Sequence, residues 1–266
     1  MRRAAIFAMA LWWATAAPAQ DMPPVDWSGA WRASSFGFFE TLPGAPICEP
    51  PPPTNDPRRH PPFTPEFEAI FQANQKRVAE GLYPDPVTVC GTPVGWPRVL
   101  ATPDGYEFIV RPEQTWILTE NGPNIVRIYT DGRDHPPEDE LWNTYTGHSV
   151  GRWEGGTLKF DTVALNGVGK VILSRAGVVM SDKLTVKTTV HEDPATRLLV
   201  FDLVLEDPVA LTRPWPVRVT FERFPPGTNM WDYACAENNR NPVDENGWTQ
   251  TLDTEGKVID VAPGQD

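Results

Sequence analysis

Side chains that could do acid–base chemistry gather in one stretch of the chain, residues 126–163. Both His135 and His148 lie there, which is half of the four histidines in the sequence. Because imidazole titrates near neutral pH, a histidine is the natural first choice for a general base. The sequence carries no CxxC or HxxxH spacing and no nucleotide-binding fingerprint. We therefore expect proton-transfer chemistry that uses side chains alone, with neither a metal ion nor a cofactor.

Each candidate in this stretch has an expected role. His148 is the first candidate for general base, and Asp131 could orient either His148 or His135. Tyr129 could donate a proton to a leaving oxygen. Guanidinium groups suit a carboxylate, an enolate or a phenolate, so the arginines are expected to bind substrate. The predicted substrate-binding residues are Arg152, Arg133, Arg127, Trp142 and Trp116.

Strand periodicity predicts which of these side chains share a face. Alternation over residues 124–131 puts Arg127, Tyr129 and Asp131 on one side, and alternation over 141–154 puts His148 and Arg152 together. His148 and Arg152 would be roughly 13 Å apart along a strand, a spacing that could bracket one bound molecule. We expect both polar faces to point into a barrel. Alternation does not identify the interior face, so a solvated outer stripe stays open.

A purely structural explanation of the same block also stays open. Asp131-Gly132-Arg133 could be a turn in which the carboxylate accepts backbone N–H groups. Arg152 could pair with Asp131 or Glu154 and pin neighbouring strands.

Two short motifs in the block suggest other activities but lack the required context. Residues 147–151, GHSVG, match the G-x-S-x-G elbow of serine hydrolases, which needs a sharp turn from a strand into a helix. The residues that follow predict another strand through a Gly-Gly turn. The run from Asp131 to Asp134 suggests a calcium loop, yet it lacks the closing glutamate.

The elements around the block predict an all-β protein. One helix is expected to start at Pro65, with Thr64 as its cap, and to end at Gly81. About ten short strands follow at near-regular spacing, including 97–103 and 170–180. We expect an antiparallel up-and-down, lipocalin-like barrel formed by residues 20–266 as one domain. Residues 42–65 form a Pro-rich extended segment and residues 225–266 a loop-rich tail.

The N-terminus indicates the compartment, and the charge balance indicates the kind of partner. Residues 1–19 read as a secretory signal peptide, with Arg2 and Arg3 before an apolar run that is too short to span a membrane. Without them the chain has 21 basic residues against 35 acidic ones, which argues against nucleic acid or membranes as partners. We expect a periplasmic or secreted protein whose partner is a small molecule. In such a compartment Cys90 and Cys235 are the expected disulfide, although spacing alone does not exclude Cys48.

Several segments resemble a known family. IYTDGRDHPPEDE, GHSVGRWEGGTLKFDT, EDPVALTRPW and YACAENNR, within residues 97–240, resemble a large, mostly uncharacterised family of secreted proteins from sphingomonads and other proteobacteria. The resemblance implies a signal peptide, a lipocalin-like architecture and a role on aromatic, lignin-derived compounds. A Gly-x-Trp such as Gly29-Ala30-Trp31 is also seen near the start of lipocalin barrels.

These observations favour a cofactor-free lyase or isomerase that acts on a bulky, partly aromatic molecule inside the barrel. A non-catalytic periplasmic binding protein for a hydrophobic small molecule is the main alternative. A serine esterase that uses Ser149 is the lesser one.

Overall fold

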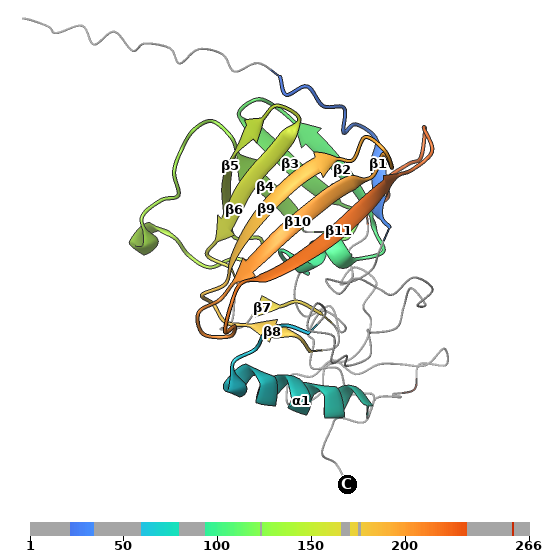
Figure 1. The fold of residues 1–266 in the computed structure, drawn as a ribbon. Coiled ribbons are helices and arrows are strands. Elements are labelled where there is room, and N and C mark those ends of the chain that lie inside the picture. Colours follow the sequence, from blue (N-terminus) through green and yellow to red (C-terminus); the bar gives the residue numbers. More distant parts are fainter. Residues whose placement is uncertain are drawn as a thin grey trace, which may run out of the picture.

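The computed structural model describes residues 22–34, 60–79, 94–122, 124–165, 171–174, 177–232 and 257. Its centre is a closed barrel of nine strands in the order β1-β11-β10-β9-β6-β5-β4-β3-β2 (Figure 1). The predicted all-β barrel is therefore confirmed. Its strands are β1 (Ala30–Ala33), β2 (Gly105–Val110), β3 (Gln114–Thr119), β4 (Ile125–Tyr129), β5 (His148–Glu154), β6 (Thr157–Val163), β9 (Thr185–Glu192), β10 (Leu199–Glu206) and β11 (Trp215–Arg223).

The barrel departs from a strict up-and-down order at one seam. Nine strands cannot alternate in direction all the way round a closed barrel, so at least one neighbouring pair must be parallel. That pair is β4 and β5, where Ile128 aligns with Ser149 and Tyr129 with Val150. A parallel pair cannot be joined by a hairpin and needs a long connection. Residues 130–147, which we call the crossover, supply it, and they include Asp131, Arg133 and His135.

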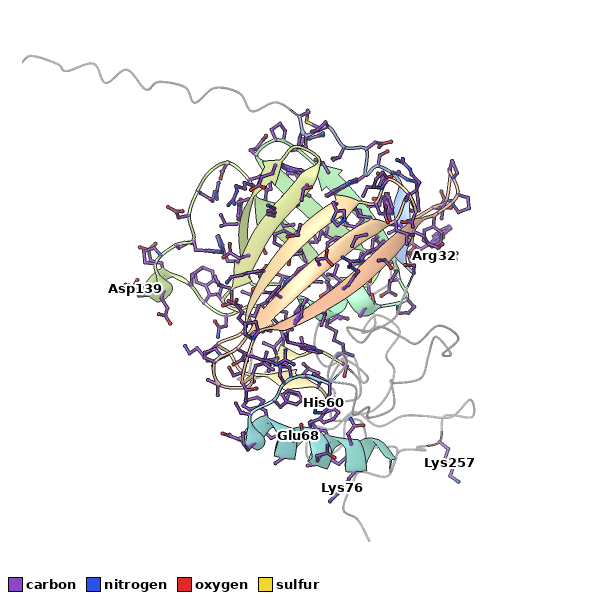
Figure 2. All side chains as sticks on the ribbon, in the orientation of Figure 1. Arg32, His60, Glu68, Lys76, Asp139 and Lys257 are labelled. Carbon is purple, nitrogen blue, oxygen red and sulfur yellow. The ribbon has the colours of Figure 1, made fainter. Side chains whose placement is uncertain are left out.

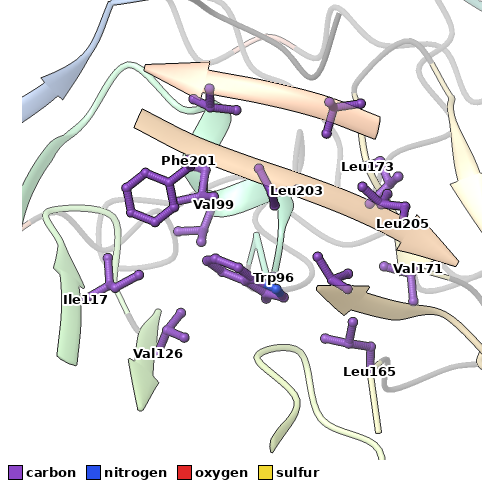
Figure 3. Packing of buried hydrophobic residues seen from close by; sticks show 14 of the residues in the cluster. Trp96, Val99, Ile117, Val126, Leu165, Val171, Leu173, Phe201, Leu203 and Leu205 are labelled. Atoms are coloured by element: carbon purple, nitrogen blue, oxygen red, sulfur yellow. The ribbon is translucent and has the colours of Figure 1, made fainter. Parts of the chain in front are cut away.

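The barrel interior is filled with aliphatic and aromatic side chains. Strand residues alternate between buried and less buried along β4, β6, β9 and β11, as one packed face and one outer face require. Trp96 precedes β2 and lies among Val99, Ile117, Val126 and Leu203 in the core (Figure 3). The backbone N–H of Trp96 donates to the Tyr145 carbonyl at 2.7 Å, so the core also holds the end of the crossover.

The start of β1 is fixed by a tryptophan under an arginine. Trp31 is fully buried, and the Arg223 guanidinium lies 4.3 Å from the centre of its ring. Arg223 also donates to the carbonyls of Asp26 and Ser28, which precede Gly29 at φ +82°. The Gly-x-Trp motif at β1 therefore packs its tryptophan into the core, where Arg223 covers the ring.

Two predicted barrel strands have other structures. Residues 170–180 form β7 (Val171–Ile172) and β8 (Val179–Met180), a separate two-stranded sheet between the barrel and the helix (Figure 1). Residues 97–103 contain the short 3-10 helix η2 (Arg98–Ala101), because prolines at both ends of this segment remove N–H donors that a ladder needs.

The one predicted helix is α1 (Pro65–Ala79). It buries Phe67 and Phe71 against the core, as its apolar stripe predicts. The predicted cap is wrong in detail, since the Thr64 hydroxyl donates to the Val209 carbonyl at 3.0 Å and does not bond the first turn. His60 pairs with Glu68 of this helix at 2.7 Å, and both are labelled in Figure 2.

Several expectations lie outside the described residues. These are the signal peptide 1–19, the Pro-rich segment up to residue 59, the helix end at Gly81, most of the tail after 232, and Cys48, Cys90 and Cys235. Within the described part of the chain, no helix has both the length and the apolar character to cross a membrane.

Candidate functional site

The polar faces of β4 and β5 point away from the barrel interior. Val126 and Ile128 of β4 are buried, whereas Arg127 is exposed and Tyr129 is half-buried. On β5 the buried residue is Ser149, so its neighbour His148 lies on the outer face. The expectation that these side chains surround a molecule within the barrel is therefore wrong, because the apolar alternate residues occupy the interior.

Two histidines and an aspartate nevertheless converge on this outer face. His135, from the crossover, lies between His148 of β5 and Asp161 of β6. The Nδ1 atoms of His135 and His148 are 2.8 Å apart, and Nε2 of His135 is 2.9 Å from Oδ2 of Asp161. His135 is only about a fifth exposed. The three side chains thus form one hydrogen-bonded chain across the outside of two adjacent strands.

The hydrogen-bond pattern fixes the arrangement of protons in the neutral form. A carboxylate only accepts, so His135 Nε2–H donates to Asp161. His135 Nδ1 is then an acceptor, and the proton in the short contact belongs to His148 Nδ1. This leaves the lone pair on Nε2 of His148. An imidazole in that tautomer can accept a proton, and the remote carboxylate favours the positive charge that results.

An aromatic ring and an ion pair extend the cluster. The Tyr129 ring stacks on His148 with ring centres 5.4 Å apart and planes at 28°. The Arg133 guanidinium lies 4.0 Å from the centre of the Tyr129 ring. Arg133 is itself held by Asp131, with nitrogen–oxygen distances of 2.5 to 3.0 Å. Asp131 therefore orients Arg133, and not either histidine as expected.

The surroundings of His148 favour its neutral form. Partial burial lowers the pKa of His148 below its ordinary value of 6.5, and the neighbouring His135 and Arg133 lower it further. The guanidinium side chain beside Asp131 lowers the pKa of that carboxyl group, so the ion pair stays charged near neutrality. At neutral pH the cluster thus presents an uncharged imidazole next to a fixed cation.

Backbone geometry at the end of the crossover positions His148. Gly147 has φ +66°, and a Cβ there would lie 2.6 Å from the Val163 carbonyl oxygen. Its N–H donates to the Thr144 hydroxyl at 2.9 Å, and Thr144 forms an isolated parallel bridge to Leu165. Only glycine fits this close, left-handed turn. It leads the chain into β5, whose first residue is His148, the hydrogen-bond partner of His135.

The remaining predicted substrate-binding residues are not part of the hydrogen-bonded chain. Arg152 is exposed and bonds Glu154 at 2.8 Å, as the structural explanation expects. Trp142 is 79% exposed in the arm of the crossover that carries η3 (Glu138–Glu140), and Figure 2 shows Asp139 of that arm well away from the barrel wall. Trp116 of β3 and Arg127 of β4 lie side by side on the outer face.

Asp161 is the site residue that sequence reasoning missed. It belongs to TLKFDTV, where buried Leu158, Phe160 and Thr162 alternate with it and place it outside. Alternation in that strand could have found its face. Its approach to His135 depends on the path of the crossover, which no local pattern reveals. Lys187 lies opposite Asp161 on β9 but bonds Glu206 at 2.8 Å.

The two short motifs have structural explanations. Ser149 is buried, bonds the Thr162 hydroxyl at 2.8 Å, and faces the opposite side of β5 from His148. As predicted, the chain continues from it into β6 through Gly155 and Gly156, so the elbow geometry is missing. In the other motif, Asp131 accepts the backbone N–H of Arg133 at 3.2 Å, a side-chain turn as expected.

Neither metal-ligand geometry nor known relatives extend this description. Among the described residues, no group of three or more histidine, cysteine, aspartate or glutamate side chains is arranged to hold a metal ion. No protein-family model matches the chain, and no curated protein matches it.

Proposed function

We propose that the protein is an exported, cofactor-free lyase or isomerase whose general base is His148. The observation that carries the proposal is the chain Asp161–His135–His148, with contacts of 2.9 and 2.8 Å. It supplies a neutral imidazole at the surface and a route for the positive charge to be shared toward a carboxylate. The site lies on the outer face of β4–β6 beside the crossover, in place of the barrel interior expected from the sequence.

The chemical step is a proton transfer. Nε2 of His148 takes a proton from a carbon of the substrate, and the electron pair left behind forms a new double bond. In a lyase this pair expels an oxygen leaving group, which takes a proton from the Tyr129 hydroxyl. In an isomerase the same proton returns from His148 to another carbon of the molecule. Outward aromatic side chains, Tyr129 and Trp116, support a bulky, partly aromatic substrate.

The test compares His148→Ala with His191→Ala, a histidine on the outer side of β9 that is outside the cluster. Turnover is assayed on a panel of aromatic hydroxy-ketones and aryl ethers, with solvent deuterium incorporation as a direct measure of proton abstraction. We expect His148→Ala to reduce turnover by about 10²–10⁴-fold and His191→Ala to leave it unchanged. Asp161→Asn should give a smaller loss, because it removes only the group that stabilises the positive charge.

The pH dependence gives a second readout. Because the pKa of His148 is lowered from 6.5, kcat/KM should rise with pH and reach half of its plateau below pH 6.5. Arg133→Gln removes one cause of the lowering and should move that midpoint upward. A profile that is flat across this range would contradict His148 as the base.

A non-catalytic periplasmic binding protein is the competing function. An aromatic surface with a few polar anchors would serve a carrier equally well. For the enzyme, His148→Ala leaves ligand affinity largely intact and abolishes turnover. Equal loss of both, or a ligand that binds without any conversion, would favour the carrier.

A further inference from the structure

One row of side chains runs across the outer wall through the proposed base. Ile109 of β2 pairs with Trp116 of β3, and Trp116 pairs with Arg127 of β4. The parallel register of β4 and β5 aligns Ile128 with Ser149, so the same register continued by one residue brings Arg127 level with His148. Four adjacent strands thus present an aliphatic group, an indole, a guanidinium and an imidazole in sequence.

The charge of Arg127 is not balanced by any residue that the structure describes. Every other arginine in the described strands has a partner: Arg32 bonds Glu222, Arg152 bonds Glu154, Arg218 bonds Asp202, and Arg223 bonds backbone carbonyls. Arg127 has no hydrogen-bond or ion-pair partner within the described residues. Its cross-strand neighbour is the indole of Trp116, and no carboxylate occupies the row. A guanidinium in this position is available to an anion from outside.

The apolar half of the row is also unusual for an outer wall. Ile109 is 39% exposed, although Phe108 beside it is buried in the core. The next outward pair on β3 and β4, Leu118 and Ile125, is apolar as well, and Ile125 is 44% exposed, while Glu107 of β2 lies beside Leu118. Outer faces of antiparallel strands are normally polar. An apolar surface that ends at an unbalanced cation matches a molecule with an apolar body and an anionic end.

We propose that this row binds an aromatic carboxylate, with the ring on Trp116 and Ile109 and the carboxylate on Arg127. This inference rests on the proposed function for its chemistry, because His148 lies level with Arg127 on the next strand, beside the carboxylate end of the bound molecule. Neighbouring strands are about 4.8 Å apart, so a ring on Trp116 and a carboxylate on Arg127 need only a short connecting chain, and His148 lies one strand further on. Arg133 and Arg152 are held by carboxylates and are not needed for this contact.

The experiment measures binding without turnover. Cinnamate is titrated into the full chain and followed by isothermal calorimetry, with cinnamamide as the neutral counterpart and hexanoate as the non-aromatic anion. We expect cinnamate to bind more tightly than either. Arg127→Gln should weaken cinnamate binding about tenfold and leave cinnamamide unchanged, because one charge-assisted contact is lost. Trp116→Leu should weaken cinnamate roughly threefold to tenfold and leave hexanoate less affected.

The matched control is Arg218→Gln, which removes an exposed strand arginine from the opposite wall and should not change cinnamate affinity. Equal affinity for cinnamate in wild type and Arg127→Gln would overturn the inference, as would equal affinity for cinnamate and cinnamamide. Preference for hexanoate over cinnamate would overturn the aromatic part. If cinnamate binds through Arg127 but His148→Ala changes no reaction, the site stands and the acid–base function falls. If cinnamate does not bind but proton exchange on neutral substrates depends on His148, the acid–base function stands and the carboxylate site falls.

Discussion

The outer face of β9–β11 and the outer face of β2–β5, here called the two walls, follow the same alternating pattern but carry different side chains. On β9–β11 the outward residues include paired charges, with Asp202 bonded to Arg218 at 2.6 and 2.9 Å and Lys187 bonded to Glu206 at 2.8 Å. On β2–β5 they include the apolar Ile109, Trp116, Leu118 and Ile125 beside Glu107 and the Arg152–Glu154 pair, and Arg127 has no such partner within the described part of the chain. The inner faces of both walls belong to one packed core. The two walls therefore differ in their outward residues and not in the core that they share.

The largest expected effect tests whether the walls share that core. Trp96→Ala should destabilise the whole barrel by about 3–5 kcal/mol, because a fully buried indole leaves a cavity that neighbouring strands cannot fill. Denaturant unfolding followed by far-UV circular dichroism measures this. The control is Trp142→Ala, the same deletion at a 79% exposed site, with an expected change within about 0.5 kcal/mol. Unfolding of Trp96→Ala in two separated steps would show that the walls are stabilised independently.

An intermediate effect tests how the crossover is attached to the β2–β5 wall. Gly147→Ala combines a left-handed backbone with a clash against the Val163 carbonyl, and should cost about 2–4 kcal/mol. Gly132→Ala has a similar φ of +86° with nothing within 4 Å of the added Cβ, so only the backbone strain of about 1–2 kcal/mol remains. Thermal unfolding of both variants gives the difference. Equal costs would mean that the close approach at Gly147 is not needed to hold His148.

The smallest effect separates the two walls by their charges. Arg218→Gln breaks an exposed ion pair and should reduce stability by about 0.2–1 kcal/mol, a loss that shrinks in roughly 1 M salt. Arg127→Gln removes the same charge from the other wall and should leave stability unchanged at any salt concentration, since none of the described residues pairs with Arg127. Urea midpoints at low and high salt measure both. A salt-dependent loss for Arg127→Gln would reveal a structural role and weaken the proposed anion contact.

Local patterns predicted the elements better than their arrangement. Alternation identified β2–β4, β6 and β9–β11, and Pro65 marked the first residue of α1. Alternation also grouped Arg127 with Tyr129 on one face of β4 correctly. It did not identify that face as the outer one, because a strand pattern is symmetric until the register with its neighbours is known.

The contacts at the candidate site were beyond the reach of the sequence. Residues 141–147 were expected to extend the strand of His148, yet they form the end of the crossover. That path brings His135 between His148 and Asp161, residues 13 and 26 positions away along the chain. Contacts between residues so far apart in the chain form only when the whole barrel closes. The number of strands, which decides that one pair must be parallel, appears only when all of them are assembled.

The parallel seam has a consequence for how this architecture can vary. A ring with an even number of strands could be completed by tight hairpins alone, and no segment would then have to travel back along the outside of the wall. Here such a segment is a geometric necessity, while its length beyond the minimum reach is unconstrained. Residues could therefore be added or removed around Asp139, which projects away from the barrel wall, without disturbing a single ladder.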